Sequence, residues 1–132
     1  VPISTHPNFQ PAAIDPAVIE DLLDLGQGSS FFADLVADFF LDAEALLDDM
    51  DAAVAAGSLP RLRDAAHALR SCSGNIGAAA MREMCGRSRT VTHESMPTEG
   101  RAMATELREE YARVRRALAQ RLNEAQATAA RS

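Results

Sequence analysis

The sequence predicts an all-α protein, an up-and-down four-helix bundle with a short extra helix at its N-terminal end. Three observations lead to this fold class. Aromatic residues are only 5% of the chain and β-branched residues are few, which favours helices over strands. Apolar residues recur every three or four positions over long segments. Glycine, proline and serine stand between these segments, at the places where helices would begin and end.

A short helix is predicted directly after an N-terminal linker. Residues 1–13 hold three of the six prolines, which indicates an extended segment. Asp15 is placed to cap the N-terminus of the helix, and Pro16 suits its first position. Gly26 is the expected stop.

The second helix is predicted to be long and amphipathic, with Ser29 or Ser30 as its N-cap and Gly57 as its end. Its apolar face comprises Phe32, Leu35, Val36, Phe39, Phe40, Ala43, Leu46, Leu47, Met50 and Val54. Its opposite face carries Asp34, Asp38, Asp42, Asp48, Asp49 and Asp51. A diiron bundle would need Glu-x-x-His pairs, which this face lacks, so we interpret it as a solvated acidic surface.

Three further helices complete the expected bundle. Ser58 caps the third helix, which is expected to stop near Asn75 with Gly77 at the break. A fourth long helix follows from about Ala78, with Met81, Met84, Cys85, Ser88 and Val91 along its core face. After a loop over residues 95–100, the last helix runs from about Thr98 to Asn123. The chain is thus divided into a linker (1–13), a bundle (14–123) and a frayed C-terminal tail (124–132).

Charge is distributed unevenly along the chain. Residues 1–60 contain 11 acidic and no basic residues, whereas residues 61–132 contain 8 acidic residues and 13 arginines. Such a dipolar surface would steer a charged partner, but a net charge of −6 argues against nucleic acid as the ligand. Two cysteines outside a Cys-x-x-Cys pair do not make a disulfide framework. No apolar run approaches the ~18 residues of a membrane span.

The third helix carries the candidate chemistry. Its core stripe is predicted to comprise Leu62, Ala66, Leu69, Ser73 and Ile76. A second stripe that points away from the core comprises His67, Ser71, Gly74 and Ala78. Arg63 and Arg70 lie four residues before and three after His67, where helix side chains can meet. An exposed imidazole with small neighbours and guanidinium groups beside it suits a reaction with an anionic group.

Other kinds of catalytic site find no support in the sequence. It contains no phosphate-binding loop, no nucleophile elbow and no zinc-ligand spacing. Cys72 lies about 140° round the helix from His67, so the two cannot form a Cys–His nucleophilic pair within a regular helix. Chemistry at a single histidine remains.

Residues 67–78 resemble the signature of histidine-containing phosphotransfer (HPt) domains, roughly His-x-Leu-Lys-Gly-(Ser/Ala)-(Ser/Ala)-x-x-(Leu/Ile)-Gly-(Ala). The matching positions are His67, Leu69, Ser73, Asn75, Ile76, Gly77 and Ala78. Arg70 replaces the usual lysine, and Ser71 replaces the usual glycine. The helical layout resembles this family over roughly residues 14–123.

The resemblance implies a bacterial phosphorelay. His67 would accept a phosphoryl group at Nε2 from an aspartate of a response-regulator receiver domain and pass it to another. The receiver would supply Mg²⁺, and this chain would bind no metal or cofactor of its own. Arg70 would contact the phosphoryl oxygens, with Arg63 in support.

The same resemblance assigns Ser71, Gly74 and Ala78 to the surface on which the receiver docks. Arg89 stands where some family members place a side chain that orients the imidazole. An arginine cannot accept a hydrogen bond, so it cannot orient the imidazole in that way.

We expect a phosphotransfer intermediate rather than an autonomous enzyme. It would be a cytoplasmic piece of a longer protein, similar to the C-terminal module of hybrid sensor kinases of the RpfC type, which sense a diffusible signal factor. Two alternatives stay open. One is a bundle that binds receivers without carrying phosphate, which Ser71 and Arg89 favour. The other is a purely structural or dimerisation bundle.

Overall fold

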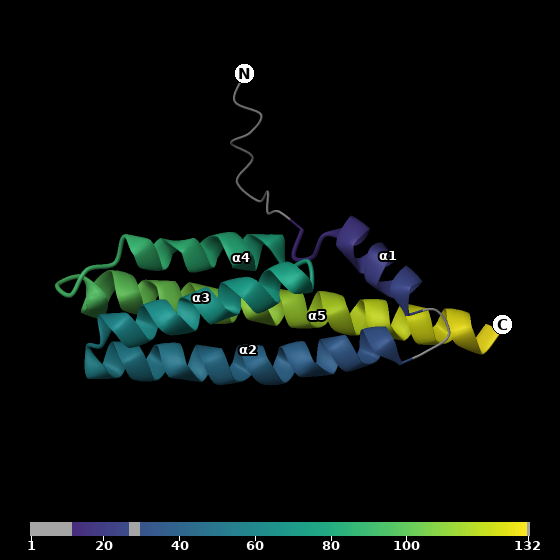
Figure 1. The fold of residues 1–132 in the computed structure, drawn as a ribbon, viewed down its shortest axis with the longest axis horizontal. Helices are drawn as coiled ribbons and strands as arrows, with labels where there is room; N and C mark the ends of the chain where they lie inside the picture. Colours follow the sequence, from purple (N-terminus) through teal and green to yellow (C-terminus); the bar gives the residue numbers. More distant parts are fainter. Residues whose placement is uncertain (1–11, 27–29, 132) are drawn as a thin grey trace, which may run out of the picture.

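The computed structural model describes residues 12–26 and 30–131, and this part of the chain is helical and contains no strand. Its elements are α1 (Pro16–Leu25), α2 (Phe31–Ala56), α3 (Leu59–Asn75), α4 (Ala79–Cys85), the 3₁₀ helix η2 (Gly86–Arg89), the π-helical turn η3 (Met96–Gly100) and α5 (Arg101–Arg131). Helices α2 to α5 lie side by side, and α1 lies near the end of the bundle where α3 passes into α4 (Figure 1). The predicted all-α bundle with a short N-terminal helix is confirmed.

The ends of α1 follow the local sequence signals. Asp15 Oδ1 accepts a hydrogen bond of 2.9 Å from the backbone N–H of Ala17, so Asp15 is the N-cap, as predicted. Pro16 occupies the first helical position. The N–H of Gly26 donates to the carbonyl of Leu22 at 3.3 Å and closes the last turn. The greater part of the expected linker, residues 1–11, lies outside the described residues.

The predicted caps at Gly57 and Ser58 are confirmed, whereas Ser30 does not cap α2 through its side chain. Gly57 ends α2 with a φ of 65°, and Ser58 Oγ accepts from the N–H of Arg61 at 3.4 Å to cap α3. Ser30 stands at the N-cap position of α2, but its hydroxyl donates to Asp34 Oδ2 at 2.9 Å and caps no backbone N–H. The alternative cap, Ser29, lies outside the described residues.

The core forms where the predicted apolar faces meet. On α3 the whole predicted stripe is buried, from Leu62 to Ile76. On α2, seven of the ten predicted positions are buried, and Leu35, Phe40 and Leu46 are half-buried at the edge. The six aspartates of the opposite face are exposed, as predicted.

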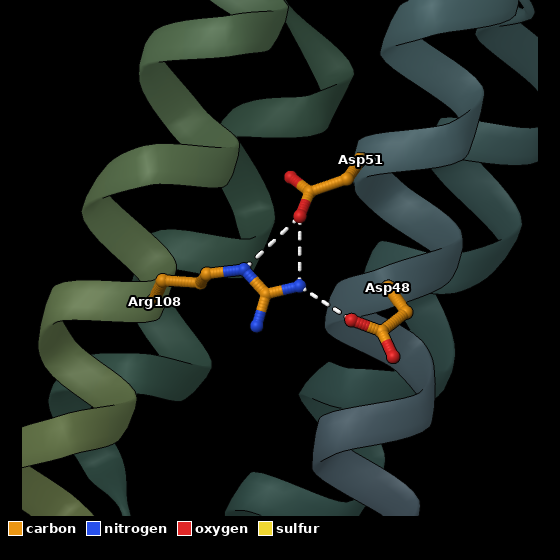
Figure 2. A network of polar contacts seen from close by, with 3 residues as sticks. All are labelled: Asp48, Asp51 and Arg108. Atoms are coloured by element: carbon orange, nitrogen blue, oxygen red, sulfur yellow. Dashed lines mark hydrogen bonds and ion pairs between the residues drawn. The ribbon is translucent and has the colours of Figure 1, made fainter.

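The acidic face of α2 is bound along one edge by Arg108 of α5 (Figure 2). Arg108 donates to Asp51 Oδ2 from Nε at 3.0 Å and from Nη2 at 2.7 Å, and Nη2 also donates to Asp48 Oδ1 at 2.6 Å. The hydrogen bonds to Asp48 and Asp51 raise the pKa of Arg108. This part of the acidic face is therefore paired within the bundle, in addition to being solvated.

A second polar cluster joins the same two helices. Glu44 Oε2 accepts from the Tyr111 hydroxyl at 2.6 Å and from Arg115 Nη1 at 2.7 Å. The guanidinium carbon of Arg115 also lies 4.3 Å from the centre of the Phe40 ring, a cation–π geometry. Burial, followed by the bond to Glu44, raises the pKa of Tyr111 to about 12. The acidic first half of the chain and the basic second half thus meet along the α2–α5 seam.

Three boundaries differ from the prediction. The fourth helix is not long: α4 spans seven residues and tightens into η2, after which the β-branched residues 90–92 favour helix continuation poorly. Residues 96–100 are not a loop but the π-helical turn η3, in which the N–H groups of Glu99 and Gly100 donate to the Ser95 carbonyl. The last helix continues to Arg131 instead of ending near Asn123, because residues 124–131 are rich in alanine and carry no stop signal.

The turn between α3 and α4 holds α1 in place. Gly77 has a φ of 80°, a conformation that favours glycine, and its carbonyl accepts from the N–H of Asp15 at 2.8 Å. A Cβ atom at Gly77 would lie 2.9 Å from Val18 Cβ. Gly77 therefore supplies both the turn and the close approach of α1, as its predicted place at the helix break requires.

We expect Gly77→Ala to destabilise the domain by more than ~1 kcal/mol, because the substitution adds backbone strain and a clash with α1. Gly86→Ala is the matched control, since Gly86 has helical dihedrals and open space around its Cβ position. That change should be neutral or stabilising by up to ~1 kcal/mol. Urea unfolding of both variants checks this, and equal stabilities would contradict the role given to Gly77.

Leu69→Ala should cost about 2–5 kcal/mol, because Leu69 is fully buried at the centre of α3. The same change at Leu41, which is 71% exposed on α2, should shift the free energy of unfolding by less than about 0.5 kcal/mol. Chemical denaturation of the pair measures the difference. A loss of only a few tenths at Leu69 would mean that this face of α3 is not the core.

Candidate functional site

His67 lies on the outer face of α3 and is exposed. Its neighbours Ala66 and Leu69 are fully buried in the core. Because successive residues of a helix are about 100° apart, burial of these two neighbours turns His67 toward solvent. The predicted exposure of the imidazole is confirmed.

His67 opens onto a surface hollow of about 210 Å³ between α3 and η2. Its lining comprises Arg63, Ala66, His67, Arg70, Cys85, Gly86, Ser88 and Arg89. The floor is made of buried small residues, and the polar side chains at the rim include three arginines and no carboxylate among the described residues. A water molecule takes up ~30 Å³ in the liquid, so the hollow has room for a group with several oxygens.

The three arginines differ in whether their side-chain N–H groups already form hydrogen bonds within the protein. Arg63 donates from Nε to the Ser88 carbonyl at 3.3 Å and from Nη2 to the Val91 carbonyl at 3.0 Å. Arg70 and Arg89 make no hydrogen bond or ion pair with any described residue. Arg63 therefore braces α3 against the segment that follows α4, while the other two keep their donors available.

The predicted docking residues do not lie in the same hollow as His67. Ser71 and Gly74 do not line the His67 hollow but a second, larger one of about 450 Å³. This second hollow is lined by Asp15, Val18, Arg70, Ser71, Gly74, Asn75, Gly77, Ala79 and Arg82. Arg70 is common to both hollows and stands between the imidazole and the predicted docking residues.

One predicted docking position, Ala78, needs correction, whereas Gly74 and Ser71 keep exposed surface beside the larger hollow. Ala78 is fully buried, because it precedes α4 directly and faces the core, so it offers a partner no surface. Gly74 is half-exposed, but a Cβ placed there would lie 3.1 Å from Cδ of Arg82. The space left by Gly74 is therefore occupied by a side chain of α4. Ser71 is exposed, as predicted.

The cysteines near the site are protonated thiols. Burial, followed by the proximity of Cys72, raises the pKa of Cys85 to about 12, and Arg70 offsets this only in part. Burial, followed by Asp42, also raises the pKa of Cys72. A thiolate is the nucleophilic form of cysteine, so neither residue is activated for nucleophilic chemistry at neutral pH.

The remaining chemistry is that of an imidazole among guanidinium groups. Arginine presents up to five N–H donors in a planar fork that matches phosphate geometry. The described residues include no cluster of His, Cys, Asp and Glu that could hold a metal ion. An exposed imidazole bordered by guanidinium groups is thus an environment that favours an anionic group.

Sequence reasoning missed the residues that come from other elements. Arg82 of α4 and Val18 of α1 border the second hollow, and Ser88 of η2 borders the first. No local pattern marks them, because their proximity depends on how α1 and α4 pack on α3. Gly86 is the one residue in the sequence that indicates an early end of α4. The 3₁₀ helix η2 begins at this glycine and lies beside His67.

The sequence model of the Hpt domain matches residues 34–128, and the chain belongs to this family. Hpt domains carry out histidine phosphotransfer in phosphorelays, in which they interact with receiver domains. The chain is therefore a histidine phosphotransfer domain of a two-component signalling system.

Particular relatives agree with this assignment. The sensory/regulatory protein RpfC of Xanthomonas campestris pv. campestris is 28% identical over 97 residues, in strain ATCC 33913 and in strain 8004. The match covers 74% of this chain but only 13% of RpfC. The crystal structure of histidine-containing phosphotransfer protein B (HptB) from Pseudomonas aeruginosa PAO1 superposes with a TM-score of 0.73 at 26% identity. That superposition covers 89% of this chain and 97% of HptB.

Among residues 12–26 and 30–131, no helix combines the length and the apolar character needed to cross a bilayer.

The raised pKa of Cys85 predicts that the domain loses stability as the pH rises above about 8.5. In that range the unfolded chain releases the thiol proton, whereas the folded state keeps it up to a pKa of about 12. The folded state then binds more protons, so the free energy of unfolding falls with increasing pH. Urea unfolding at pH 7.5–10 should show a shallower fall for Cys85→Ala than for the wild type, and identical slopes would contradict the burial effect.

Proposed function

We propose that His67 is the phosphoacceptor of this Hpt domain. In its neutral form, Nε2 attacks the phosphorus of a receiver's aspartyl phosphate. The N–P bond forms as the P–O bond to the aspartate breaks, and the carboxylate leaves. Onward transfer to a second receiver is the same reaction in reverse. One observation carries the proposal: an exposed imidazole opens onto a hollow bordered by three arginines and no described carboxylate.

The other site residues have auxiliary roles in this proposal. Arg70, with free donors at the rim, contacts the phosphoryl oxygens during transfer. Arg63, whose Nε and Nη2 bind carbonyls, supports the hollow and adds positive charge. Ser71 and the hollow beside it face the docked receiver. The receiver supplies Mg²⁺ and the remaining catalytic groups, since phosphoryl transfer needs charge neutralisation by a metal ion and in-line positioning.

We further propose that the domain works at the cytoplasmic end of a hybrid sensor kinase of the RpfC type. One observation supports this: the 28% identity to RpfC over 74% of this chain. A separate phosphotransfer protein similar to HptB is the competing arrangement. In either case the chain is an intermediate that depends on partner proteins for the initial phosphorylation.

Incubation with a phosphorylated receiver domain from the same genome should transfer acid-labile phosphate to the wild-type domain. His67→Gln should abolish this uptake and change the free energy of unfolding by less than ~0.5 kcal/mol, because the side chain lies outside the core. His93→Gln is the matched control, since His93 is also exposed but lies outside the hollow. Radiolabel on the chain and thermal melting are the two measurements.

Two results would contradict the proposal. Phosphate uptake by His67→Gln would place the acceptor elsewhere, and a large loss of stability would make His67 a structural residue. A wild-type domain that binds receivers but takes up no phosphate would instead support the receiver-binding alternative. The exposed hydroxymethyl group of Ser71, one turn from the imidazole, is the observation that favours it.

A further inference from the structure

We propose that Arg89 is a second phosphoryl-binding residue, which acts with Arg70 to hold the phosphorylated side chain of His67. The inference rests on the proposed phosphoacceptor role of His67. It gives Arg89 a task that does not require it to accept a hydrogen bond from the imidazole.

The first argument is the composition of the hollow. Arg89 and Arg70 border it from different elements, η2 and α3, with His67 on the same rim. Four other hollows on the described surface each include at least one carboxylate, whereas this one has none among its described lining residues. Two guanidinium groups without a neutralising partner make an environment that favours an added dianion over the free imidazole.

The second argument is the state of the donors. Six arginines of the described chain are bound to carboxylates or carbonyls: Arg63, Arg87, Arg108, Arg113, Arg115 and Arg121. Arg89 and Arg70 have no such partner within the described residues, which is also true of Arg61, Arg82, Arg101 and Arg116, but of these six only Arg70 and Arg89 border the His67 hollow. Their N–H groups are therefore available to a ligand without the loss of an existing bond, and a charge-assisted bond to a phosphoryl oxygen is about twice as strong as a neutral one.

The third argument is how Arg89 is positioned. It ends η2, and η2 is held from both sides. Arg63 of α3 donates to the carbonyl of Ser88, which directly precedes Arg89, and Arg87 pairs with Glu106 of α5. Thr90, which follows Arg89, donates from both N–H and hydroxyl to the Arg87 carbonyl. The backbone that carries Arg89 is thereby fixed beside His67, and Arg63 acts as a positioning residue for it.

The chemistry of guanidinium determines when Arg89 acts. Its N–H groups are donors only, so it has nothing to offer the N–H of a neutral imidazole. Once phosphorus is bound to Nε2, the phosphoryl oxygens are acceptors within the same hollow. The charged phosphoryl oxygens are stronger acceptors than the single unprotonated nitrogen of a neutral imidazole, so Arg89 stabilises the phosphorylated state more than the free one. Its loss should therefore affect the phosphorylated state more than the fold or the free imidazole.

The test attaches the phosphoryl group chemically and so does not depend on a receiver. Phosphoramidate phosphorylates histidine: the imidazole nitrogen attacks phosphorus, the P–N bond of the reagent breaks, and ammonia leaves. His6→Gln and His93→Gln in the background leave His67 as the single acceptor among the three histidines. The ³¹P NMR signal of the phosphorylated domain is then followed as a function of pH, which gives the pKa of the phosphoryl group.

Arg89→Ala should raise the pKa of the phosphoryl group by about 1, because a nearby cation favours the dianion. Arg89→Lys should restore much of this effect, whereas Arg89→Gln should resemble alanine, because it keeps hydrogen-bonding capacity but no charge. Arg116→Ala is the matched control, which removes one exposed arginine of α5 outside the hollow and should leave the pKa unchanged. The phosphohistidine of Arg89→Ala should also equilibrate with a receiver about tenfold further toward the receiver.

An Arg89→Ala titration that coincides with the wild type and with Arg116→Ala would overturn the inference, as would an equal effect of Arg89→Gln and Arg89→Lys. Failure of the wild-type domain to take up phosphate at His67 even from phosphoramidate would overturn it too. If phosphoramidate succeeds, Arg89→Ala shifts the titration and no receiver transfers phosphate, then the Arg89 contact stands and the proposed relay function fails. The two claims are thus separable.

Discussion

The burial of one face of α3 is the constraint on which the site depends. Leu62, Ala66 and Leu69 are removed from water together, at about 25 cal/mol per Å² of apolar surface. A regular helix cannot rotate one residue independently of its neighbours, so burial of these three fixes the direction of His67 as well. The exposure of the imidazole is therefore a consequence of core packing, and no separate interaction is needed to hold it outward.

The second organising interaction is electrostatic and joins α2 to α5. The carboxylates of Asp48 and Asp51 meet Arg108, and Glu44 meets Arg115 and Tyr111. An isolated exposed ion pair contributes little to stability. A network in which one guanidinium binds two carboxylates is the arrangement in which exposed charges do contribute. This seam pairs basic groups of α5 within the fold, whereas Arg70 and Arg89 have no ion pair with any residue that the structure describes.

Local signals in the sequence predict local structure well here, and they fail where tertiary packing decides. Asp15, Gly57 and Ser58 are caps whose bonds lie within a few residues, so their sequence patterns suffice. The short α4 and the burial of Ala78 depend on contacts with α1, α3 and α5, which no local pattern encodes. The helix face and the local signature are enough to predict the exposure of His67, whereas the full lining of its hollow depends on how η2 packs beside α3.

Arg70 belongs to two hollows at once, and this shared position links them thermodynamically. A guanidinium whose donors are engaged on one side is less available on the other. A ligand of the larger hollow between α1, α3 and α4 that engages this guanidinium would change the free energy of an anion beside His67, and that anion would change the affinity of the larger hollow by the same factor. With His67 as the proposed phosphoacceptor and the larger hollow facing the partner, this one side chain would couple partner contact to the phosphorylation state.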